Sequence, residues 1–99
     1  MTTKLADGDK NNFLDLIVVS DELAFIRSEL KRLDEGFIEA TQSQYYEKAS
    51  EIRFEKHKLK LRWHELKYLC TVYLEECEFK WYRWKSLQEV RLFMKREFD

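Results

Sequence analysis

The feature that most constrains the fold is a seven-residue repeat of apolar side chains that begins near residue 16. In the first part of the chain the repeat fills both core positions of four consecutive heptads with Leu16, Val19, Leu23, Ile26, Leu30, Leu33, Phe37 and Ala40. This period places the apolar residues on one face of an α-helix, which then has to pack against another helix. The repeat predicts an all-α, coiled-coil-like fold with a first helix over residues 13–40.

A second repeat runs from residue 45 to residue 98 without proline or glycine. Its core positions hold Tyr45, Ala49, Ile52, Leu59, Trp63, Leu66, Cys70, Tyr73, Cys77, Trp84, Leu87, Met94 and Phe98. The polar run TQSQ, residues 41–44, lies between the two repeats and fits a turn with a capping box. The sequence therefore predicts a long antiparallel helical hairpin with an extended second helix over residues 45–98.

Residues 1–12 precede the first repeat and are mostly polar. We expect them to form a flexible leader ahead of a single helical domain that spans residues 13–99. A chain of 99 residues is long enough for one small domain.

The second repeat has apolar side chains on two faces. Those that lie away from the hairpin seam or beside it are Phe54, Leu61, Tyr68, Phe79, Trp81 and Tyr82. A helix with two apolar faces has to be covered on both, and the shorter first helix can cover only one. We expect these six residues to mediate self-association or partner binding, giving a dimer or a larger assembly. The alternative is a three-helix bundle in which the second helix breaks near residues 70–78.

The segment KWYRWK, residues 80–85, interleaves aromatic and basic side chains. Surfaces that bind single-stranded nucleic acid combine the same residue types, because bases stack on aromatic rings. On a continuous helix, however, these aromatic side chains point in different directions, with Trp84 in the seam. This spread favours packing or a protein interface over a base-stacking surface.

Charge is distributed unevenly along the chain. Residues 1–52 carry six Lys and Arg against eleven Asp and Glu, whereas residues 53–99 carry twelve against eight. Antiparallel packing of the two halves would neutralise most of this difference. If one basic flank stays free, Arg53, Lys60 and Lys67 are the residues expected to contact an anionic partner such as nucleic acid.

Residues with metal or redox chemistry are few and badly spaced. His57 and His64 lie two helical turns apart and cannot share a metal ion, and Cys70 and Cys77 are too far apart along a helix for a disulfide. The two cysteines are predicted to be reduced, buried thiols of a cytoplasmic protein. We expect no metal site, no cofactor and no membrane segment.

Signals for catalysis are also missing from the sequence, since it has neither a glycine-rich phosphate loop nor an activated nucleophile. We therefore expect neither a catalytic residue nor a small-molecule substrate. The sequence predicts a non-enzymatic protein–protein interaction module, such as an adaptor, an assembly factor or a small inhibitor or regulator, which acts through its aromatic-rich second helix. The alternative function is nucleic-acid binding by the basic flank of that helix.

Overall fold

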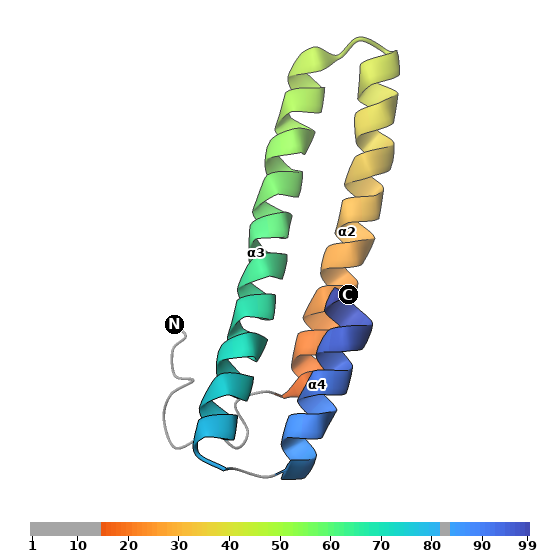
Figure 1. Cartoon of the computed structure of the whole chain (residues 1–99). Coiled ribbons are helices and arrows are strands. Elements are labelled where there is room, and N and C mark those ends of the chain that lie inside the picture. Colours follow the sequence, from red (N-terminus) through yellow and green to blue (C-terminus); the bar gives the residue numbers. More distant parts are fainter. Residues whose placement is uncertain (1–14, 82–83) are drawn as a thin grey trace. The chain divides into compact units, whose positions relative to one another are not determined.

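A computed structural model describes residues 15–81 and 84–99 of the chain (Figure 1). These residues form three helices and no strand: α2 (Leu16–Gln42), α3 (Tyr46–Phe79) and α4 (Trp84–Phe98). The all-α prediction is confirmed. The expected leader, residues 1–12, lies outside the described residues.

The helices divide into two compact units, which we describe separately. One unit is Glu22–Glu65, and the other combines Met1–Asp21 with Leu66–Asp99. We refer to them as the hairpin unit and the terminal unit. The single domain expected over residues 13–99 stays a prediction.

The hairpin unit contains most of α2 and the first half of α3, which run antiparallel and side by side (Figure 1). Its core consists of Leu33, Ala40, Ala49 and Ile52, with the half-buried Phe37 and Leu59 packed against them. These are heptad positions of both repeats, and burying them removes apolar surface from water. The packing in this unit is that of the predicted hairpin.

The turn between α2 and α3 differs from the predicted capping box. The Thr41 hydroxyl donates to the carbonyl of Phe37, 2.7 Å away, so it belongs to the last turn of α2 and does not cap α3. The backbone N–H groups of Gln44 and Tyr45 donate instead to the carbonyls of Thr41 and Ala40. These two bonds form a Schellman motif, and Gln44, with φ of 64°, occupies the left-handed position that glycine usually takes.

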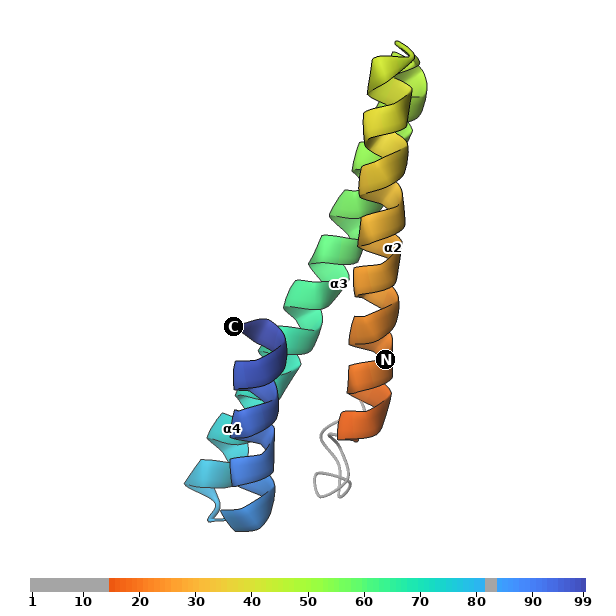
Figure 2. The same ribbon diagram turned by 90° about the vertical axis from the view of Figure 1, so that its right-hand side faces the viewer.

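The terminal unit is built from the start of α2, the second half of α3 and α4. Its core contains Tyr73, Cys77, Leu87 and Val90, against which the half-buried Leu16, Leu74 and Met94 pack. Figure 2 shows α4 lying beside the end of α3, and the Arg91 guanidinium pairs with the Glu78 carboxylate between these two helices. The unit also orders the start of α2, where Asp15 Oδ1 accepts from the N–H of Ile17 at 3.1 Å as an N-cap.

The predicted uninterrupted second helix is wrong, because the chain turns after Phe79 and α4 begins at Trp84. The turn falls later than the break near residues 70–78 that the three-helix alternative supposed. Its physical reason is the second apolar face of the repeat. By folding back, α4 buries its own apolar residues Val90 and Phe93, which a straight helix would leave without a partner in this chain.

Both cysteines lie buried in the terminal unit as thiols outside any disulfide, as the sequence predicted. Cys70 has no exposed surface, and this burial raises the pKa of its thiol to about 11 from an ordinary value of 9.0. The thiolate form is therefore strongly disfavoured while the protein is folded.

We expect this buried thiol to make the fold less stable in alkali. A pKa that is higher in the folded state than in the unfolded state favours folding below the unfolded value, and the advantage is lost as the pH rises through the folded value. The free energy of unfolding, measured by urea titration, should therefore decline between pH 9.0 and about 11. The Cys70→Ala variant should show a smaller decline, and an equal decline in both proteins would contradict this assignment.

Candidate functional site

Among the described residues of the terminal unit, the most exposed aromatic side chains lie where α3 ends and α4 begins. Phe79 is 82% exposed, Trp81 is 90% exposed and Trp84 is 69% exposed. Tryptophan has the largest apolar surface of any side chain and is normally mostly buried. Exposed aromatic residues in such a group are typical of interaction sites.

A concavity of about 450 Å³ lies beside these aromatic rings, and we call its lining the tryptophan turn. It is lined by Glu78, Trp81, Trp84, Leu87 and Arg91. Leu87 is buried and belongs to the core of the unit, whereas the ion pair of Glu78 with Arg91 links α3 to α4. The tryptophan turn thus lines an apolar hollow that has one charged edge.

The backbone of Trp81 is strained. Its φ is 59°, a left-handed value that is rare for a bulky residue. The Trp81 N–H donates to the carbonyl of Glu78 at 3.2 Å, which places the residue just after the C-cap of α3, where glycine is the usual choice. A non-glycine residue there costs about 1–2 kcal/mol. Strain of this kind is retained most often at sites that bind or react.

The binding residues predicted from the sequence are exposed wherever the structure describes them. Phe54 and Leu61 belong to the hairpin unit, whereas Tyr68, Phe79 and Trp81 belong to the terminal unit, and Tyr82 lies outside the described residues. Of the described members of this set, Phe79 and Trp81 lie close together in the chain, at the end of α3 in the terminal unit. Their role in binding stays a prediction.

The prediction that Trp84 lies in the hairpin seam is wrong. Trp84 is the first residue of α4, at the open end where α3 has already finished at Phe79, so α3 does not cover its side chain. The heptad register was extended to Trp84 on the assumption of a continuous helix, so it did not predict the end of α3. The cluster of aromatic residues within KWYRWK was a better signal of exposed aromatic side chains. A helix seam can bury only one of them, so the others need another location.

The expected basic flank is divided between the two units. Arg53 and Lys60 lie in the hairpin unit and Lys67 in the terminal unit. Arg53 lies with its guanidinium 5.8 Å from the centre of the Phe37 ring, where its charge interacts with the ring face. The structure thus gives these three cations no shared surface within one unit.

Other cations of the basic segment pair with acidic residues of α2. Arg62 contacts the Glu22 carboxylate at 2.5 and 3.0 Å, and Lys56 pairs with Asp34. The Arg62 guanidinium holds the pKa of Glu22 below its ordinary value, through hydrogen bonds first and charge second. Within the hairpin unit, the predicted neutralisation of acidic by basic residues is confirmed for these pairs.

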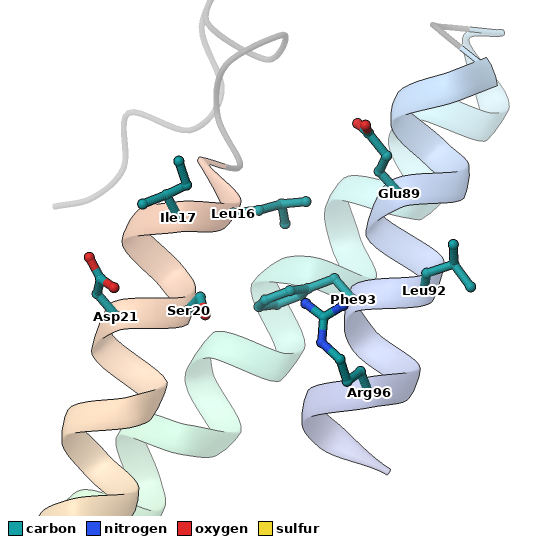
Figure 3. A pocket seen from close by; sticks show the side chains of 8 residues that line it. All are labelled: Leu16, Ile17, Ser20, Asp21, Glu89, Leu92, Phe93 and Arg96. Carbon is teal, nitrogen blue, oxygen red and sulfur yellow. The ribbon is translucent and has the colours of Figure 1, made fainter.

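A second concavity of about 460 Å³ lies in the terminal unit between the start of α2 and α4 (Figure 3). Its lining consists of Leu16, Ile17, Ser20, Asp21, Glu89, Leu92, Phe93 and Arg96. The Arg96 guanidinium lies over the Phe93 ring, 5.7 Å from its centre, and Arg96 Nε donates to Glu97 at 3.1 Å. This hollow has mixed charges and no exposed aromatic ring. It provides exposed apolar residues, such as Leu92, for control substitutions.

Within the described ranges, no group of three or more His, Cys, Asp or Glu side chains is placed to hold a metal ion. None of the three helices described by the structure has an apolar stretch long enough to cross a membrane. Comparison of the chain with protein-family models, with curated proteins and with solved structures finds no match.

Proposed function

We propose that the protein is a non-enzymatic protein-binding module, in the class of adaptors, assembly factors or small regulators, and that it binds its partner through the tryptophan turn. The observation that carries this proposal is Trp81, which is almost fully exposed and held in a strained backbone conformation beside the exposed Trp84. Tryptophan is among the residues that most often dominate the energy of protein interfaces. Gln44 adopts the same conformation at an ordinary turn, so it is the combination of this conformation with a nearly fully exposed tryptophan that supports a binding role.

The basic flank supports the alternative, nucleic-acid binding, less well. Arg53 lies against Phe37, and nearby cations pair with acidic residues in the hairpin unit. Phosphate contacts would have to compete with these interactions, and each lost contact weakens binding.

Self-association belongs to the same proposal. Phe54 and Leu61 expose apolar surface in the hairpin unit, and Tyr68 does so in the terminal unit. Either surface can serve as a contact between copies, including a coiled-coil contact. Light scattering that gives the mass of a dimer or larger assembly would support it, and a monomer at high concentration would overturn it. Buried cysteines that form no disulfide also fit a reducing compartment, and we propose a cytoplasmic location.

The proposed function is tested by substituting Trp84 and identifying which bound proteins are lost. Tagged wild-type protein and the Trp84→Ser variant are used for affinity capture, with the Leu92→Ser variant as the matched control. Both substitutions replace an exposed apolar residue of α4 with serine, but only Trp84 lines the tryptophan turn. We expect at least one protein to be retained by wild type and Leu92→Ser and lost by Trp84→Ser. An identical set of captured proteins for all three would count against the proposal.

A further inference from the structure

A cation lies close in sequence to the tryptophans of the concavity. Residues 80–85 include three basic residues and no acidic one. Of these, Lys85 lies exposed in the first turn of α4, next in sequence to Trp84 of the concavity. The charge of Arg91 is already paired with Glu78. The positive charge that α4 offers to a partner near Trp84 is therefore that of Lys85.

The concavity itself is suited to a large apolar side chain. Trp81, Trp84 and Leu87 supply its apolar lining, and the pair of Glu78 with Arg91 supplies its polar edge. An apolar group that enters it removes aromatic surface from water, which is the main source of affinity at such sites. Lys85 would then attract carboxylates at the rim of the contact.

From this arrangement we infer that the partner is an acidic protein segment that inserts a large apolar side chain between Trp81 and Trp84 and places carboxylates beside Lys85. The inference rests on the proposed function and specifies the chemistry of the partner. A symmetric contact with a second copy through the tryptophan turn is disfavoured, because it would bring the Lys85 side chains of the two copies together.

The acidic residues of α3 favour a short protein segment over an extended polyanion. Glu75 and Glu76 lie exposed within the last turns of the helix, ahead of Trp81. A nucleic acid or an anionic membrane presents negative charge over a wide area and would meet these glutamates as well as Lys85. An acidic peptide can place a few carboxylates at the turn and avoid them.

The test uses a dye-labelled synthetic helical peptide with leucines on one face and glutamates on the other, titrated with the full-length protein by fluorescence anisotropy. Two matched peptides replace the glutamates with lysines or the leucines with alanines. We expect each matched peptide to bind at least about tenfold more weakly, and added salt to weaken binding of the original. Equal affinity for the glutamate and lysine peptides would overturn the inference.

Variants of the protein locate the contact. Lys85→Glu and Trp84→Ser should each weaken binding of the acidic peptide by about tenfold or more, whereas Lys60→Glu, an exposed cation of the hairpin unit, should not change it. An equal effect of Lys85→Glu and Lys60→Glu would indicate general charge attraction and would overturn the inference.

Single-stranded oligonucleotides and vesicles rich in phosphatidylserine are titrated in parallel. Tighter binding of either, if Trp84→Ser abolishes it, would replace the acidic segment with that partner class. The proposed function and the inference about partner chemistry can fail separately. If Trp84-dependent proteins are captured but the acidic peptide does not bind, the proposed function stands and the inference about partner chemistry falls.

Discussion

Replacing Trp81 with glycine is expected to stabilise the fold and, at the same time, to weaken binding of the acidic peptide by about thirtyfold or more. Trp81 has a φ of 59°, which glycine adopts without a steric penalty. Relief of that penalty, offset by the greater freedom of glycine in the unfolded chain, should raise the free energy of unfolding by about 0.5–1 kcal/mol. Removal of a central interface tryptophan typically costs about 2 kcal/mol or more of binding free energy.

The chain offers a matched control in Gln44, at the turn between α2 and α3. Gln44 occupies the same left-handed position, with φ of 64°, but lies in the hairpin unit and carries no aromatic side chain. Gln44→Gly should give a similar gain in the free energy of unfolding, measured by urea titration, and leave peptide binding unchanged. If Trp81→Gly loses stability, its side chain packs in the fold, and if it keeps full affinity, the tryptophan turn is not the binding site.

The opposite effects expected for Trp81→Gly distinguish a binding residue from a structural one. A residue kept for packing loses stability when it is removed, and any loss of binding then follows from unfolding. A residue kept for binding at a strained position behaves in the reverse way, because strain relief and loss of the contact act on different equilibria.

The pairing of α2 with α3 could be predicted because its signals are local and repeated. Leu33, Ala40, Ala49 and Ile52 recur at helical heptad spacing, and all four are buried in one core. The helix boundaries were less predictable. Gly36 does not end α2, which continues to Gln42, because a single glycine in a helix costs only about 1 kcal/mol and the packed heptads outweigh it.

The three-helix alternative anticipated that the chain folds back, but it placed the break near residues 70–78, because no glycine or proline marks the turn after Phe79. Trp81 makes the turn by adopting a left-handed conformation at a cost of about 1–2 kcal/mol. Burying one large apolar side chain contributes about 1.5–3 kcal/mol, so Val90 and Phe93 together outweigh the strain. This balance depends on tertiary contacts, which no local pattern of turn residues reports.

The same turn determines how much of the candidate site was visible in the sequence. Phe79 and Trp81 could be chosen because they fell outside the predicted seam, and both are exposed. Trp84 was assigned to the seam because the heptad was extended across the turn, and it now lines the concavity. Leu87 and Arg91 join the site only because α4 folds back, bringing Arg91 to Glu78.

Truncation of Phe93 to alanine should cause the largest loss of stability that we expect from any single substitution in α4. Phe93 is 2% exposed and meets the Phe98 ring edge to face, with ring centres 6.1 Å apart. Phenylalanine-to-alanine changes in a core cost about 3–5 kcal/mol, out of a total of about 5–15 kcal/mol for a typical small protein. Urea titration followed by circular dichroism should show this loss, with the amides of α4 becoming the least protected against hydrogen exchange.

Phe79→Ala is the matched control, because it removes the same side chain from a position that is 82% exposed, and it should change the free energy of unfolding by no more than about 0.5 kcal/mol. Phe93→Ala should also reduce peptide binding, but only in proportion to the fraction of molecules in which α4 is unfolded, since Trp84 and Arg91 reach the tryptophan turn through that helix. Full stability of Phe93→Ala would show that α4 does not pack as the structure has it. Loss of binding with α4 still folded would instead place Phe93 in the contact itself, and the tryptophan turn would no longer suffice as the site.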